Sequence, residues 1–168
     1  FDWSVVKMGP SDYRMYYGAI NPNSPSVVKC TNMKKELRYA TSTDLVHWTT
    51  QPGAIFSDVG CGVPHVLRKP DGTYLMYHNT ITTQHGIHIA TSNDGLNWTA
   101  LSGPLLNNQD LVDPAPIVMP DGTYLMVSST MGAGGPQELQ LLSSPDGVTW
   151  TLRSTDLYAP AGVSVLDP

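Results

Sequence analysis

Acidic residues recur at one position of this sequence. Asp2 and Asp113 each lie eleven residues before a tyrosine, and Asp167, like Asp113, is followed directly by a proline. Carboxylates that converge on a narrow space are costly unless they bind a ligand or share protons, so their recurrence indicates a chemical site. The alternative is that Asp before Pro only favours an extended or turn conformation. Asp113, Asp167 and Asp2 are the candidate catalytic residues.

Further side chains are candidates for binding a ligand at the same site. The chain has only two glutamates, Glu36 and Glu138, and a carboxylic acid beside an ionised partner can act as a general acid. Exposure to solvent at the start of an outer strand is the alternative for both. Among the histidines, the one that follows a proline is the best candidate, and a packing or hydrogen-bonding role is the alternative. The candidate substrate-binding residues are His65, Trp3, Tyr17, Tyr77 and Glu138.

These residues belong to a repeated pattern of about fifty residues. Trp48, Trp98 and Trp150 end three copies of a motif that contains Ser-x-Asp, and they are 50 and 52 residues apart. A second motif, Pro-Asp-Gly-Thr-Tyr-Leu-Met, begins at residue 70 and again at residue 120, so two motifs keep one register. We expect the Ser and Asp side chains to bond turn backbone and the Trp side chains to pack between repeats.

Each repeat is expected to contain four short antiparallel strands. Pro-Asp-Gly and Asp-Gly are hairpin turn signals, and the runs beside them are rich in aromatic and β-branched residues. No segment shows a 3.6-residue periodicity over the length of a helix. The expected strands are residues 2–8, 13–18, 37–41 and 47–49, then 64–68, 73–78, 86–92 and 97–100, and finally 114–119, 123–128, 139–143 and 149–153.

Four-stranded antiparallel units at this period predict an all-β fold, a β-propeller whose blades pack radially around a channel. We expect one partial propeller domain over residues 1–168, with blades at about 1–50, 62–101 and 112–153 and the start of another at 163–168. A closed propeller needs at least about four blades. The chain is therefore expected to belong to a longer protein or to pair with a second copy of itself.

Composition limits the classes of partner. Nine Lys and Arg against fourteen Asp and Glu give a formal charge of -5, which disfavours nucleic acid and anionic membranes and suits a neutral polar ligand such as a carbohydrate. No apolar run approaches the roughly 18 residues of a membrane helix. Two cysteines, Cys30 and Cys61, exclude a four-cysteine zinc site, and a disulfide between them would indicate an extracellular or periplasmic protein. We predict no metal site and no cofactor.

The motifs resemble those of the five-bladed propeller glycosidases, the superfamily that includes glycoside hydrolase families 43 and 32. The resemblance rests on residues 39–48 and 89–98, on the two Asp-Gly-Thr-Tyr-Leu-Met hairpins and on Val112-Asp113-Pro114. It implies a five-bladed parent fold and cleavage of furanosides or pentose-containing glycans. In that family one Asp is the base or nucleophile, a second Asp tunes pKa and a Glu is the general acid. Asp113 and Asp167 match the first two positions, and Asp2 matches the innermost-strand position of its own unit.

The resemblance fails at the general acid. Residues 62–65 read Gly-Val-Pro-His and resemble the family's Glu-Gly-Pro-His segment, so Gly62 stands where the acid would be. The catalytic set is incomplete unless further blades supply a glutamate. Gly62 and Val63 favour an alternative, a non-catalytic sugar-binding or scaffolding propeller. A purely structural repeat module is a third possibility, in which the aligned aspartates would tolerate Ala without loss of a ligand.

Overall fold

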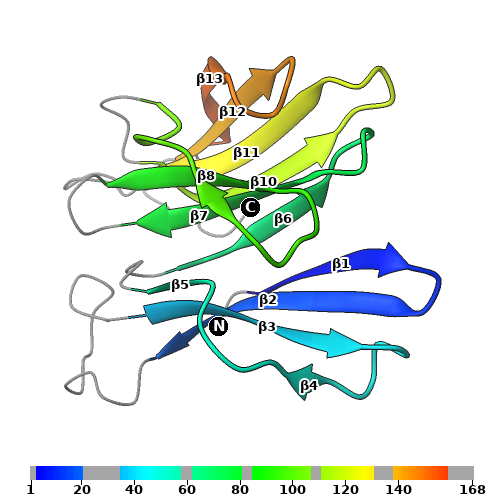
Figure 1. Cartoon of the computed structure of the whole chain (residues 1–168). Helices are drawn as coiled ribbons and strands as arrows, with labels where there is room; N and C mark the ends of the chain where they lie inside the picture. Colours follow the sequence, from blue (N-terminus) through cyan, green and yellow to red (C-terminus); the bar gives the residue numbers. More distant parts are fainter. Residues whose placement is uncertain are drawn as a thin grey trace.

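The computed structural model describes six segments of the chain, residues 3–20, 35–57, 62–80, 85–106, 111–130 and 138–158. Every helix or strand assigned within these segments is a β-strand, which confirms the predicted all-β fold. The strands form three antiparallel sheets that follow one another in the order of the sequence (Figure 1). No helix with the length and apolar character needed to cross a membrane occurs in the described segments.

The first sheet contains one strand more than expected. Its strands, in order of pairing, are β1 (Trp3–Gly9), β2 (Asp12–Ile20), β3 (Lys35–Ser42) and β4 (Thr49–Thr50), and β5 (Phe56–Ser57) also pairs with β3. After β4 the chain returns along β3, because Ile55 N–H donates to the Leu37 carbonyl over 2.7 Å. The unexpected strand β5 therefore extends the edge beside β3 by two residues.

The second and third sheets each pair their four strands in sequence order. The second sheet consists of β6 (His65–Arg68), β7 (Tyr74–Thr80), β8 (Gly86–Ser92) and β9 (Thr99–Ala100). The third sheet consists of β10 (Leu111–Val118), β11 (Tyr124–Thr130), β12 (Leu139–Ser144) and β13 (Thr151–Tyr158). Strand β10 begins earlier and β13 ends later than the turn signals alone predict.

The first strands of the three sheets lie next to one another. Strand β1 contacts β6, and β6 contacts β10. Each sheet therefore extends outward from its first strand, as the blades of a propeller do around a channel. Figure 1 shows the resulting stack, with the blue and cyan first sheet below the green second sheet and the yellow and orange third sheet.

Two apolar cores fill the spaces between neighbouring sheets. The core between the first and second sheets contains Val6, Tyr16, Leu37, Val66, Tyr74, Met76 and Ala90. The core between the second and third sheets contains Leu75, Tyr77, Ile87, Ile89, Leu111, Tyr124, Met126, Leu142 and Trp150. Because each core draws on two sheets, the sheets stabilise one another by burial of shared apolar surface.

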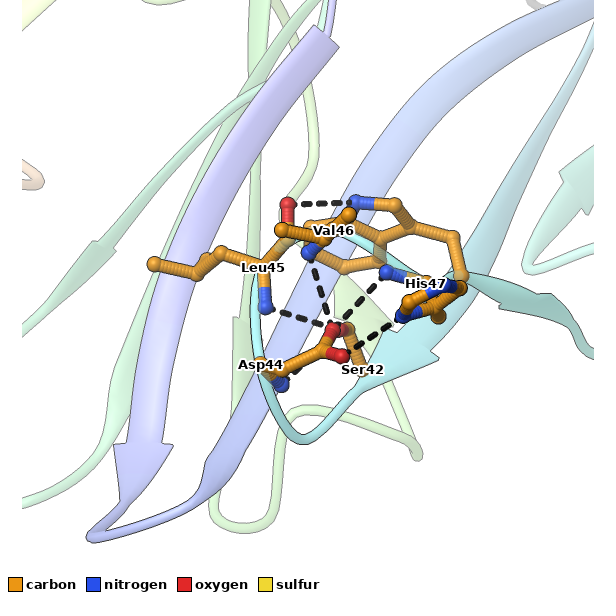
Figure 2. Close-up of polar contacts among 6 residues, drawn as sticks. Ser42, Asp44, Leu45, Val46 and His47 are labelled. Atoms are coloured by element: carbon orange, nitrogen blue, oxygen red, sulfur yellow. Dashed lines mark hydrogen bonds and ion pairs between the residues drawn. The ribbon is translucent and has the colours of Figure 1, made fainter.

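The Ser-x-Asp motif forms a closed loop of hydrogen bonds (Figure 2). Ser42 Oγ accepts the Leu45 N–H over 2.9 Å, and Asp44 Oδ1 accepts the His47 N–H over 2.8 Å. A further hydrogen bond from the His47 ring lowers the pKa of Asp44. Trp48 Nε1 donates to the Leu45 carbonyl over 3.2 Å. Corresponding Ser, Asp and Trp contacts recur in the other two copies, so the motif holds its own turn as expected.

Each of these loops in the second and third sheets also receives a tyrosine from the preceding sheet. Tyr16 donates its hydroxyl to the Gly95 carbonyl over 2.8 Å, and Tyr77 donates to the Gly147 carbonyl over 2.6 Å. Both tyrosines are fully buried, and burial raises the pKa of Tyr16 to about 12. A neutral hydroxyl thus ties the second strand of one sheet to the turn of the next sheet. We call this contact the tyrosine joint.

The first and the third sheet each lack one half of this joint, the half that would face a further sheet. In β11 the tyrosine position is occupied by Val127. In the loop of the first sheet the glycine position is occupied by Leu45, which has a φ of 66° and a side chain that is 49% exposed. Val127 has no hydroxyl to donate, and a side chain at the glycine position would collide with an incoming tyrosine, since a Cβ atom at Gly95 would lie 2.7 Å from the Tyr16 hydroxyl.

Candidate functional site

Asp113 lies at an irregular point of the first strand of the third sheet. The register between β10 and β11 shifts between Val112 and Ala115. Within this bulge Asp113 has a φ of 54°, in the left-handed region that residues other than glycine seldom adopt. Such strained conformations persist only where their surroundings hold them, and they cluster at functional sites.

The carboxylate of Asp113 is held at both of its oxygens. Ser129 Oγ donates to Asp113 Oδ2 over 3.0 Å, and Asn79 Nδ2 donates to Asp113 Oδ1 over 3.2 Å. The backbone N–H of Asp113 donates to Asn79 Oδ1, also over 3.2 Å. Asn79 is 2% exposed and Ser129 is 0% exposed, whereas Asp113 is half-buried. Two buried side chains from β7 and β11 therefore fix the carboxylate of a residue that is itself only half-buried.

The peptide that precedes Asp113 is fixed as well. Ser128 is fully buried, and its hydroxyl donates to the Val112 carbonyl over 2.7 Å. Ser128 and Ser129 are adjacent on β11, so successive side chains of one strand support the backbone and the carboxylate of the same bulge. The bulge is thus held from both β11 and the neighbouring sheet.

Asn79 and Ser129 were not among the residues expected from the sequence. They occupy the same position of the repeat, five residues after Tyr74 and Tyr124, and Gly18 has this position in the first copy. The available signal is a polar residue close to the end of a strand whose other residues are mostly buried and apolar. That signal does not reveal which carboxylate the polar side chain meets.

Trp3 and Tyr17 come together, but not beside Asp113. They are direct partners in the ladder between β1 and β2, so both side chains lie on the same face of the first sheet. Tyr16 reaches the second sheet, and successive side chains of a strand point to opposite faces, so Tyr17 faces away from the second sheet. Trp3 is 63% exposed there. Asp113 lies instead where the second and third sheets meet.

His65 and Tyr77 are direct ladder partners in the second sheet. His65 is half-buried, and burial lowers its pKa below the ordinary value. Tyr77 is 0% exposed and uses its hydroxyl in the joint with Gly147. Of this pair, only His65 retains access to solvent.

The two glutamates differ in their surroundings. Glu138 is half-buried just before β12, where its N–H donates to Thr130 Oγ1 over 3.2 Å. The Glu36 side chain is 13% exposed and accepts two hydrogen bonds from Arg38, over 2.9 and 2.7 Å. Glu36 is thus engaged in an ion pair within its own strand. Four residues singled out from the sequence lie outside the described residues, namely Asp2, Asp167, Cys30 and Cys61.

A buried histidine near the candidate site is expected to make stability fall as the pH falls. His78 is 6% exposed and stacks on Phe56 at a centroid distance of 5.6 Å, and burial, followed by the nearby His88, lowers its pKa to about 4. The unfolded chain binds this proton near pH 6.5, so between about pH 6.5 and 4 protonation favours unfolding by up to roughly 1.4 kcal/mol per pH unit.

Urea denaturation at pH 7 and pH 5 tests this effect. The free energy of unfolding of the wild type should fall by about 2 kcal/mol more than that of His78→Phe, which keeps a ring against Phe56. Groups that titrate independently of His78 affect both proteins equally, so the difference reports His78 together with its neighbour His88. Identical pH dependence in the two proteins would contradict the prediction.

No cluster of three or more His, Cys, Asp or Glu side chains is placed to hold a metal ion within the described residues.

The sequence matches one family model over most of its length. Residues 9–162 match the model described as the glycosyl hydrolases family 32 N-terminal domain. No curated protein matches the sequence.

Solved glycosidase structures share the fold at low sequence identity. A putative glycosidase from Bacteroides thetaiotaomicron superposes with a TM-score of 0.73 at 18% identity, over 99% of this chain and 52% of that one. A thermostable family-43 glycoside hydrolase superposes with a TM-score of 0.69 at 16% identity, over 94% of this chain and 53% of that one. A family 32 β-fructofuranosidase from Bombyx mori superposes with a TM-score of 0.65 at 20% identity, over 92% of this chain and 34% of that one. The chain thus spans about half of the first two proteins and a third of the last.

Proposed function

Because the chain belongs to the glycosyl hydrolases family 32 N-terminal domain family, we propose that it contributes to cleavage of furanosides or pentose-containing glycans, with Asp113 as a channel carboxylate. The observation that carries this proposal is the clamped carboxylate. Asp113 has both oxygens hydrogen-bonded to buried side chains and a backbone conformation that needs support. The fold alone gives no reason for such an arrangement.

A fixed carboxylate suits the chemistry of glycosidic cleavage. A base or nucleophile must approach the anomeric carbon from a defined direction, and rigid placement of the reacting group contributes much of the rate. We propose that Asp113 has this role and that Asp167 and Asp2 are the neighbouring carboxylates. His65 is the candidate substrate contact that its access to solvent supports. The binding roles of Trp3, Tyr17, Tyr77 and Glu138 stay predictions.

Assays with chromogenic furanosides and with pentose-containing glycans test the proposal. We expect release of the chromophore from at least one furanoside, and nuclear magnetic resonance of the first product will give the stereochemical outcome. An inverting enzyme needs its acid and base roughly 6.5–9.5 Å apart, and a retaining enzyme needs about 5–5.5 Å. Absence of turnover on the whole panel would contradict the proposed reaction.

A sugar-binding protein without turnover is the second candidate. Gly62 is buried and has a φ of 79°, a conformation that strains any residue with a side chain, so this position does not suit a glutamate. Val63, which aligns with Asp113 in the repeat, carries no acid either. Binding on a glycan array together with no hydrolysis of chromogenic glycosides would favour this candidate.

We also propose that the three sheets are blades at about residues 1–50, 62–101 and 112–153 and that further blades cover the two outer faces. Trp3 is 63% exposed on the first sheet and Ile117 is 54% exposed on the third, which supports this. These further blades belong either to the same polypeptide or to a second copy of this chain. Light scattering after size-exclusion chromatography separates these cases, because a monomer excludes the second copy.

A further inference from the structure

We propose that Asn79 is the positioning residue for Asp113 and that it acts across the boundary between the second and third sheets. This assignment rests on the proposed function of Asp113. Asn79 uses both ends of its amide group on one residue, since Nδ2 donates to the Asp113 carboxylate and Oδ1 accepts the Asp113 N–H. Side chain and backbone of Asp113 are thereby oriented together.

Only one orientation of the Asn79 amide satisfies both contacts. A backbone N–H can only donate, so the oxygen of Asn79 must face it. The NH₂ group then faces the carboxylate, which as an ion can only accept. Because Asn79 is 2% exposed, water cannot readily replace either contact. The amide therefore acts as a rigid template for the left-handed conformation of Asp113.

The repeat shows that the fold does not require an amide at this position. The first sheet has Gly18 where the second has Asn79, and yet the first two sheets pack through a shared core. Just before the first strand of the second sheet, Val63 has the repeat position of the carboxylate, whereas in the first strand of the third sheet Asp113 has it. An amide is thus present where the next unit has the carboxylate and absent where the next unit has Val.

Ser4 provides a matched control for a merely structural role. Its hydroxyl oxygen accepts the Val66 N–H over 3.0 Å, from the first strand of the next sheet, and Ser4 is 8% exposed. Ser4 and Asn79 therefore make the same kind of backbone contact between successive sheets. Ser4 differs because its partner is an aliphatic residue and not a carboxylate.

Amide hydrogen exchange, measured residue by residue in the intact chain, tests the contact without reference to activity. In Asn79→Ala the Asp113 amide should exchange about tenfold faster, as expected for the loss of one hydrogen bond, while the Val66 amide is unchanged. Ser4→Ala should show the opposite pattern. An unchanged Asp113 amide in Asn79→Ala would overturn the proposal whether or not the protein is active.

Kinetics separate positioning from packing. On a furanoside that the wild type cleaves, Asn79→Ala should lower kcat by about 10–100-fold and change KM less than about threefold, whereas Ser4→Ala retains wild-type kinetics. Asn79→Asp keeps the oxygen for the Asp113 N–H but places a second carboxylate beside Asp113. Its kcat should fall while the Asp113 amide stays protected.

The outcomes distinguish this proposal from the proposed function. Faster exchange at Asp113 without any loss of kcat in Asn79→Ala would overturn the positioning role and leave the reaction intact. A wild type that cleaves no furanoside would overturn the proposed function, and the role of Asn79 in that reaction with it. The exchange data would still show in that case whether Asn79 orients Asp113. If Asn79→Ala does not fold, Asn79→Asp decides, because a kcat equal to that of the wild type in this variant would overturn the positioning role.

Discussion

Asp113→Asn should abolish hydrolysis, with a loss of at least about a thousandfold in kcat on any furanoside that the protein cleaves. The substitution keeps the size of the side chain but removes its negative charge. It also places an NH₂ group where Asp113 now accepts from Asn79 or from Ser129. A neutral amide is a poor base and a poor nucleophile, so the step that needs the carboxylate should stop.

The measurement is steady-state kinetics together with circular dichroism to confirm folding. Asp121→Asn is the matched control, because Asp121 is an exposed aspartate in the hairpin between β10 and β11, at the other end of the same strands. It should leave kcat unchanged. Full activity of Asp113→Asn would exclude Asp113 from the reaction and would favour a different carboxylate.

Gly147→Ala should lower the free energy of unfolding by about 3 kcal/mol. A Cβ atom at Gly147 would lie 2.5 Å from Leu75 Cδ1 and 3.2 Å from both the Tyr77 hydroxyl and a Tyr124 ring carbon. Overpacking of this kind costs roughly 1–3 kcal/mol. The φ of 77° adds about 1 kcal/mol for a residue with a side chain.

Gly122→Ala separates the two contributions. Gly122 has a φ of 85°, but an added Cβ would meet nothing within 4 Å. We therefore expect a loss of only about 1 kcal/mol from backbone strain. Urea denaturation of both variants gives the comparison. Equal losses would mean that the contacts around Gly147 relax at no cost, against our expectation for a packed core.

Most strands could be predicted because they are bounded by local signals. Pro-Asp-Gly and Ser-x-Asp-Gly fix the turns, and the alternating runs between them fix the strands. Strand β5 was missed because it has only two residues, Phe56 and Ser57, and depends on pairing with β3 and not on a turn. Asp146-Gly147 indicates a turn, but the contact of Gly147 with Tyr77 is not visible in the sequence, since that tyrosine comes from a different sheet.

The candidate site was predictable only where the repeat itself marks it. Asp113 stands out because its position, eleven residues before a tyrosine, can be located in each copy of the repeat. Asn79 is 34 residues away in the sequence, and its contact with Asp113 depends on how two sheets meet. Its partner could not be identified without that geometry. The sequence marks Tyr77 as a candidate ligand contact, and its place in the core between the second and third sheets depends on how these sheets pack.

The three repeat units differ in which halves of the tyrosine joint they carry. The second unit carries both halves, Tyr77 and Gly95, and so it could follow a copy of itself. The first unit offers a tyrosine but presents Leu45 in place of the glycine, and the third accepts a tyrosine but offers Val127. Shuffled or duplicated genes should therefore tolerate extra copies of the middle unit, while exchange of the first and third would juxtapose mismatched ends.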